Sequence, residues 1–131
     1  MSNRTILVIE DNALNMKLVK SLLKIGNYTI LEAEDAETGI RLAQEQKPDL
    51  ILMDIQLPGM DGLTATRILK KDQAINGTPI VALTSHAMEG DEQKARDAGC
   101  DGYISKPIDT RAFLQSIENH LKTSMSMQSH G

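Results

Sequence analysis

Carboxylates stand at the ends of two apolar runs in this sequence. Glu10 and Asp11 follow the run at residues 6–9, and Asp54 closes the run that begins at residue 50. Carboxylates that share one cleft raise each other's pKa unless a cation neutralises them. Mg²⁺ suits such a group, because it prefers oxygen ligands and is commonly bound by carboxylates together with a phosphate, whereas Zn²⁺ favours His or Cys. The pattern therefore predicts a magnesium site.

The same carboxylates suit phosphoryl transfer. With the metal bound by Glu10 and Asp11, Asp54 stays ionised and can attack a phosphoryl group, which gives an aspartyl phosphate. The Thr84 hydroxyl and the Lys106 ammonium follow other apolar segments and are the kinds of group that hold phosphoryl oxygens. Taken alone, Asp54 is equally well explained as a cap of the next loop or helix. The other four residues favour the chemical role.

These groups come together only if the segments that carry them form one sheet. Short apolar or β-branched runs predict strands at residues 6–9, 28–33, 50–54, 79–83 and 103–104. Helical periodicity between them predicts helices at residues 13–25, 36–46, 63–71 and 89–98, and a last one that includes residues 113–121. Asn12, Asp35 and Asp109 are the expected N-caps, and Gly26 and Gly99 end helices.

Alternating strands and helices indicate a doubly wound α/β domain, with five (βα) units and helices on both faces of a parallel sheet. Ligands of such sheets bind at the carboxyl ends of the strands, where the polar residues above are expected. The chain has 131 residues, enough for one domain. We expect that domain over residues 1–122 and a disordered tail over residues 123–131.

Composition argues against several classes of function. The net charge is −4 and the pI about 5.3, with basic residues scattered, so direct binding of nucleic acid is not expected. Cys100 has no second cysteine with which to form a disulfide or a zinc site. The sequence contains neither a secretory signal nor an apolar stretch long enough for a membrane span, so we expect a cytoplasmic protein without membrane contact.

The chain resembles the receiver domains of bacterial response regulators over residues 6–121. The matching motifs, in chain order, are Glu10-Asp11, Asp54 with Leu57-Pro58-Gly59-Met60-Asp61-Gly62, Thr84, Tyr103 and Lys106-Pro107. Five motifs in order are far more specific than any one of them. The resemblance implies the flavodoxin-like strand order 2-1-3-4-5. The family's cis peptide corresponds to residues 106–107, where the spacing leaves cis or trans open.

The resemblance also implies roles for these residues. Asp54 is the phosphoacceptor, and Glu10, Asp11, Asp54 and the Gln56 backbone carbonyl bind Mg²⁺. Thr84 and Tyr103 look like the switch pair, in which the hydroxyl closes on the phosphoryl group and the ring moves inward. The donor is then a histidine kinase or a histidine phosphotransfer protein. Such a domain catalyses only its own phosphorylation and dephosphorylation, so we do not expect an enzyme that acts on other substrates.

Segments 10–18, 47–58 and 103–108 resemble the single-domain regulators of the DivK type. That likeness implies a stand-alone receiver, which signals through protein contacts on the face of its fourth helix, fifth strand and fifth helix. A receiver cut from a hybrid histidine kinase is the alternative.

Two unrelated functions fit less well. A magnesium-dependent aspartyl-phosphate phosphatase needs a second acid where this chain has Gln56, and a flavodoxin needs a phosphate loop where it has Glu10 and Asp11.

Overall fold

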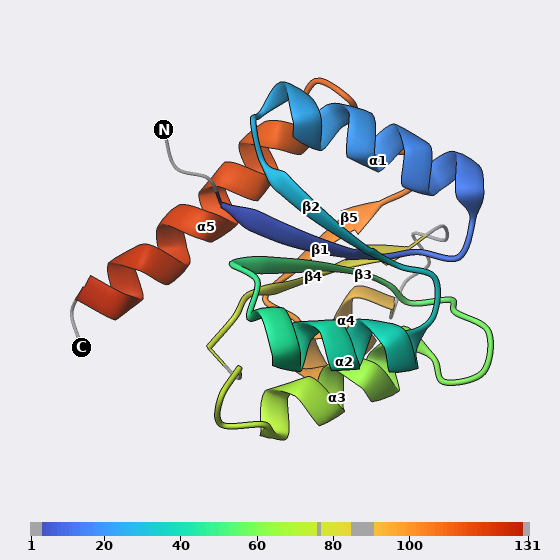
Figure 1. Cartoon of the computed structure of the whole chain (residues 1–131), viewed down its shortest axis with the longest axis vertical. Coiled ribbons are helices and arrows are strands. Elements are labelled where there is room, and N and C mark those ends of the chain that lie inside the picture. The colour runs from blue at the N-terminus through green and yellow to red at the C-terminus, as the bar shows by residue number, and fades with distance from the viewer. Residues whose placement is uncertain (1–3, 76, 85–90, 130–131) are drawn as a thin grey trace.

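Five parallel strands form one sheet in the order β2-β1-β3-β4-β5 (Figure 1). The computed structural model describes residues 4–75, 77–84 and 91–129. The strands are β1 Thr5–Ile9, β2 Thr29–Ala33, β3 Leu50–Asp54, β4 Ile80–Thr84 and β5 Gly102–Ser105. Both the doubly wound fold and the strand order implied by the family resemblance are confirmed.

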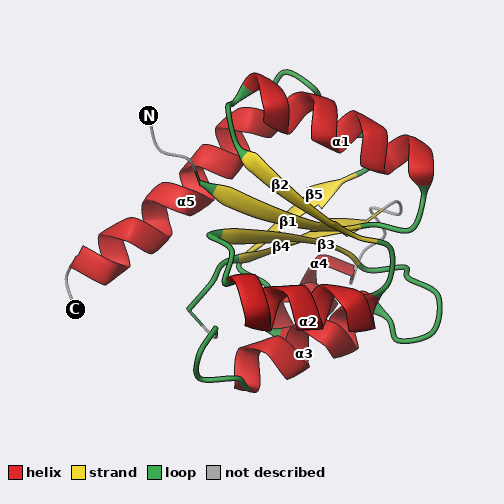
Figure 2. Ribbon diagram, viewed as in Figure 1, coloured by secondary structure: helices red, strands yellow, loops and turns green. Residues whose placement is uncertain are grey.

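Helices cover both faces of the sheet (Figure 2). They are α1 Ala13–Ile25, α2 Ala36–Gln46, α3 Gly62–Lys71, α4 Asp91–Ala98 and α5 Phe113–Ser129. Helices α1 and α5 lie on one face, α2 and α3 lie on the other, and α4 contacts α3 and β5. Among the described residues, no helix combines the length and apolar character that a bilayer crossing requires.

The helices on both faces explain why the central strands are apolar throughout. Residues of β1 and β3 alternate between two hydrophobic cores, one beneath α1 and α5 and one beneath α2 and α3. Every residue of β3 and β4 is therefore buried. Polar groups are confined to the strand ends, where they reach the edge of the sheet together.

Side-chain caps place the helix starts close to the predicted positions. Asn12 Oδ1 accepts hydrogen bonds from the backbone N–H groups of Leu14 and Asn15, and Asp35 Oδ1 accepts one from Thr38. Asp109 caps a turn that precedes α5 and not the first turn of the helix itself.

The last helix is longer than predicted. It continues to Ser129, past residue 122, where the sequence predicts that the domain ends. The segment beyond residue 122 lacks proline, and its one glycine is the terminal residue 131, so nothing in its composition ends a helix earlier. Helix α4 begins at Asp91, and the predicted earlier start at residue 89 lies outside the described residues.

Gly39 offers a test of the packing between α2 and β1. A Cβ at this position would overlap Ile9 Cδ1 and lie 2.7 Å from Ile9 Cγ1. We expect Gly39→Ala to lower the free energy of unfolding by about 1–3 kcal/mol, because overpacking outweighs the roughly 1 kcal/mol gained in helix propensity. Urea denaturation measures this, with Glu45→Ala on the exposed side of α2 as the control. A Gly39→Ala protein as stable as wild type would contradict the close contact.

Candidate functional site

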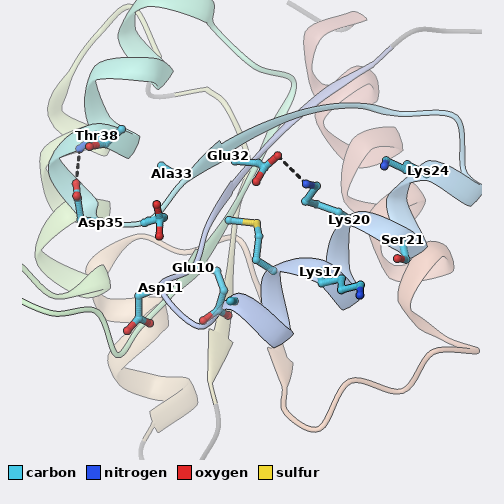
Figure 3. A pocket seen from close by; sticks show the side chains of 13 residues that line it. Glu10, Asp11, Lys17, Lys20, Ser21, Lys24, Glu32, Ala33, Asp35 and Thr38 are labelled. Atoms are coloured by element: carbon cyan, nitrogen blue, oxygen red, sulfur yellow. Dashed lines mark hydrogen bonds and ion pairs between the residues drawn. The ribbon is translucent and has the colours of Figure 1, made fainter.

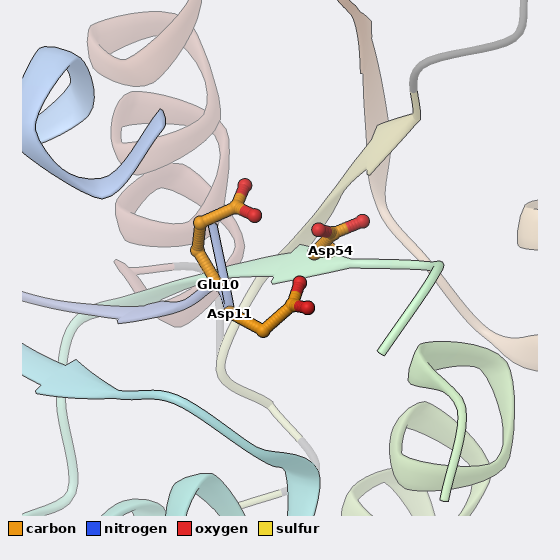
Figure 4. A group of neighbouring side chains, drawn as sticks. All are labelled: Glu10, Asp11 and Asp54. Carbon is orange, nitrogen blue, oxygen red and sulfur yellow. The ribbon is translucent and has the colours of Figure 1, made fainter. Parts of the chain in front are cut away.

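Three carboxylates gather at the carboxyl ends of β1 and β3 (Figure 4). Glu10 and Asp11 follow β1, and Asp54 is the last residue of β3, the strand paired with β1. One oxygen from each residue lies within 4.8 Å of the other two. Glu10 is 1% exposed and Asp54 is 4% exposed, whereas Asp11 is open to solvent. The predicted acidic group is therefore formed by two segments that are more than 40 positions apart in the chain, since 54 minus 11 is 43.

Lys106 joins two of these carboxylates. Its Nζ lies 2.8 Å from Glu10 Oε1 and 3.2 Å from Asp54 Oδ2. The residue follows β5, and its backbone N–H donates to the Thr84 carbonyl oxygen at 2.6 Å. The Lys106–Pro107 peptide is cis. Lys106 was predicted to hold phosphoryl oxygens, but its pairing with Glu10 was not predicted and has no signal in the sequence.

Asp54 is an unusually weak acid in this environment. Burial, a hydrogen bond with Glu10 and the Glu10 charge raise the pKa of Asp54 to about 7, against the opposing effects of the Gln56 N–H and Lys106. For Lys106, burial lowers the pKa, but the two carboxylates outweigh it, and the net shift is upward. Within the described part of this site, three carboxylates face one ammonium group. That excess of negative charge on oxygen atoms fits a hard divalent cation.

Thr84 and Tyr103 occupy the next two strands. Thr84 is 2% exposed at the end of β4, between β3, which ends in Asp54, and β5, which Lys106 follows. Tyr103 is half-buried on β5 and lines a cavity of about 300 Å³ together with Arg96 of α4 and His120 of α5. The structure thus brings Thr84 to the same edge as Asp54, while the switch role of this pair stays a prediction.

The loop after Asp54 is held against the strand end. The Gln56 N–H donates to Asp54 Oδ1 at 2.9 Å, and the role of the Gln56 carbonyl as a metal ligand remains a prediction. A Cβ on Gly62 would overlap the Asp54 carbonyl oxygen and lie 2.8 Å from Ile55 Cα. Only glycine allows α3 to begin this close to the phosphoacceptor candidate. The sequence indicated a turn there but not this contact.

A groove of about 750 Å³ lies beside Glu10 and Asp11, between α1 and the end of β2 (Figure 3). Lys17, Lys20 and Lys24 line its α1 side, and Lys20 Nζ lies 2.8 Å from Glu32 Oε2 on β2. No chemical group was predicted at the end of this strand. The three lysines are spaced by three and four residues, which places them on one face of a helix. That spacing is the sequence signal for the basic side of the groove.

Residues 6–118 match the family model of the response regulator receiver domain. The chain belongs to the response regulator receiver family. Two relatives of this receiver are the polar-differentiation response regulators DivK of Brucella anthropi and Brucella ovis. Each is 42% identical to it over 118 residues, which cover 90% of this chain and 96% of the relative. Receiver domains are signalling modules of two-component systems.

Solved receiver structures are also similar. The receiver domain of the sensor histidine kinase PA1611 from Pseudomonas aeruginosa PAO1, with a magnesium ion coordinated in its active-site cleft, is 30% identical and superimposes with a TM-score of 0.86 over 92% of this chain and 99% of that one. A CheY-like receiver domain protein from Methanospirillum hungatei JF-1 is 26% identical, with a TM-score of 0.88 over 96% and 99% of the two chains. This receiver therefore shares the family's fold over nearly its whole length.

The weak acidity of Asp54 predicts a pH dependence of stability in the metal-free receiver. The pKa of Asp54 is about 7 in the folded state and 3.8 ordinarily, so between these values the folded state binds more protons than the unfolded state. The contribution of Asp54 to the free energy of unfolding is therefore largest below about pH 4 and is lost as the pH rises to about 7.

We therefore expect the free energy of unfolding to fall less between about pH 5 and pH 8 in the Asp54→Asn protein than in wild type. At about pH 8 the Asp54→Asn protein is expected to be the more stable of the two. Urea denaturation with a chelator present measures both. Asp35→Asn, which removes a half-buried carboxylate outside the acidic site and keeps an N-cap, serves as the control. Equal pH slopes for wild type and Asp54→Asn would rule out the raised pKa.

Proposed function

We propose that this chain is a stand-alone receiver of a two-component phosphorelay that accepts a phosphoryl group on Asp54. The observation that carries the proposal is a nearly buried Asp54 at a strand end, next to two further carboxylates and 3.2 Å from the Lys106 ammonium. The donor is a phosphohistidine of a histidine kinase or a phosphotransfer protein. An Asp54 oxygen forms a new bond to phosphorus, and the bond between phosphorus and the imidazole nitrogen of the donor breaks. The electron pair of the broken bond stays on the imidazole nitrogen.

Glu10, Asp11, Asp54 and the Gln56 backbone carbonyl would hold Mg²⁺ in this site. When bound, the ion supplies charge neutralisation for the carboxylates and the phosphoryl oxygens. The all-oxygen donor set supports this choice, as does the excess of carboxylates over ammonium groups in the described site. The PA1611 receiver, whose structure contains magnesium in its cleft, is a relative with the same fold.

The chain's own residues orient the reaction. The Gln56 N–H holds Asp54 Oδ1 at 2.9 Å and so fixes the plane of the carboxylate. Lys106 Nζ, which is already beside Asp54 Oδ2, donates to a phosphoryl oxygen after transfer. The Thr84 hydroxyl donates to another phosphoryl oxygen from the neighbouring strand.

The signal leaves through Tyr103. Movement of the Thr84 hydroxyl toward the phosphoryl group frees space for the Tyr103 ring, and the cavity between α4, β5 and α5 lets that ring move. A downstream protein then recognises this face in one of its two states. The likeness to DivK across 96% of that protein supports a stand-alone regulator.

Phosphorylation at Asp54 is tested by incubating the protein with Mg²⁺ and acetyl phosphate. We expect intact-protein mass spectrometry to show the addition of one phosphoryl group, which hydroxylamine removes. Asp54→Asn is expected to abolish the labelling, because it removes the nucleophile, and omission of Mg²⁺ is expected to suppress it. Asp35→Asn is the matched control and keeps full labelling. Labelling of the Asp54→Asn protein at the wild-type level would overturn the assignment.

The switch is tested by Thr84→Val, which keeps the branched shape but removes the hydroxyl. With beryllofluoride as a phosphoryl mimic, we expect amide NMR shifts near Asp54 in both proteins and shifts along β5 and α5 only in wild type. Thr66→Val is the control, because Thr66 is buried elsewhere and its hydroxyl donates to the Gly62 carbonyl oxygen. If beryllofluoride shifts the β5 amide signals of the Thr84→Val protein as much as those of wild type, the Thr84 hydroxyl has no part in the signal.

A further inference from the structure

Both oxygens of Glu10 are bound by donors from this chain. Oε1 pairs with Lys106 Nζ at 2.8 Å, and Oε2 accepts the backbone N–H of Asn12 at 3.1 Å. Because Glu10 is only 1% exposed, solvent contributes little to fixing its carboxylate. Besides its contact with Asp54 Oδ2 at 3.2 Å, the Lys106 ammonium is therefore held by two short links in series, from Asn12 to Glu10 and from Glu10 to Lys106.

Asn12 is itself held by the first turn of α1. Its side-chain Oδ1 accepts the N–H groups of Leu14 at 2.9 Å and Asn15 at 3.0 Å, and its carbonyl oxygen accepts the N–H of Met16 at 2.9 Å. These three bonds fix the backbone of Asn12 in an extended conformation, with φ −84° and ψ 119°. In that conformation its own N–H points back at Glu10 Oε2.

We propose that Asn12 is a positioning residue for phosphoryl transfer, which acts on Lys106 through Glu10. The inference rests on the proposed function of Asp54. Asn12 aims the Glu10 carboxylate, and Glu10 holds the Lys106 ammonium beside Asp54 Oδ2. A glutamate suits this task, because its two oxygens contact different parts of the chain. Oε2 accepts the backbone N–H of Asn12, two residues further along, and Oε1 pairs with Lys106. Lys106 follows β5, and β3 and β4 lie between β5 and β1.

The inference separates Asn12 from an ordinary helix cap. Loss of the Asn12 side chain frees the backbone of residue 12, so its N–H no longer stays on Glu10 and the Lys106 ammonium loosens. Asn12→Ala is therefore expected to lower the phosphorylation rate at saturating Mg²⁺ by roughly tenfold, the smaller end of the usual loss when an outer partner of a metal site is removed. Asn12→Ser is expected to restore the rate, because serine caps helices about as well as asparagine.

A matched control distinguishes positioning from stability. Asp35→Ala removes the cap of α2 in the same way, since Asp35 Oδ1 accepts the Thr38 N–H at 2.8 Å. We expect its thermal midpoint to fall about as much as that of Asn12→Ala, while its phosphorylation rate stays near that of wild type. Equal rate losses in the two variants would overturn the inference.

The direct measurement is the ¹⁵N NMR signal of the Lys106 ammonium in the metal-free, unphosphorylated protein. We expect the signal to be shifted or lost in Asn12→Ala and to be retained in Asn12→Ser and Asp35→Ala. An unchanged signal in Asn12→Ala would overturn the inference. This measurement does not depend on phosphoryl transfer, so it remains decisive even if acetyl phosphate fails to label wild type, a result that would refute the proposed function alone.

Discussion

The ion pairs of Lys106 are the interaction on which the site depends. Glu10 and Asp54 are both nearly buried, and two buried like charges destabilise a fold unless a cation pairs with them. Lys106 provides that cation by contacting both, and its own backbone N–H is anchored on Thr84. The ammonium neutralises only part of the negative charge, because Asp11 adds a third carboxylate. The remaining charge is what makes the cleft suited to a divalent cation and, with the cation, to phosphoryl oxygens.

The apolar sheet keeps this charged cluster in place. Because β3 and β4 are buried on both faces, a carboxylate is tolerated only at the strand end, where Asp54 lies. The register between β1 and β3 places Asp54 beside Glu10. Two local features then fix the loops. Gly62 lets α3 approach the Asp54 carbonyl oxygen, and Asn12 joins the cap of α1 to Glu10. Close contacts therefore hold the site on the side of β1 and β3.

The opposite side of the site is less tightly packed. In contrast to β3 and β4, the residues of β5 are half-buried or exposed, and a cavity separates Tyr103 from complete contact with α4 and α5. A phosphorylation signal needs an element with two accessible arrangements, and loosely packed elements supply these at small cost in free energy. The contrast between a buried β3 that carries the proposed phosphoacceptor and a half-buried β5 that carries Tyr103 accords with the proposal that the signal is received at one strand and leaves at another.

Local patterns in the sequence are enough to predict the helices, the strands and the chemical groups of the site. Continuous apolar runs, the caps Asn12 and Asp35, and the acids at residues 10, 11 and 54 follow from local chemistry that any short segment displays. Only the folded chain brings together Lys106 and Glu10, Gly62 and the Asp54 carbonyl oxygen, and Lys20 and Glu32, because spacing along the sequence does not predict which of these atoms meet. The extent of α5 was also missed, because polar residues without glycine or proline permit both a helix and a tail. The raised pKa of Asp54 also depends on the folded environment, because burial and the nearby Glu10 cause it. No local sequence pattern predicts this shift.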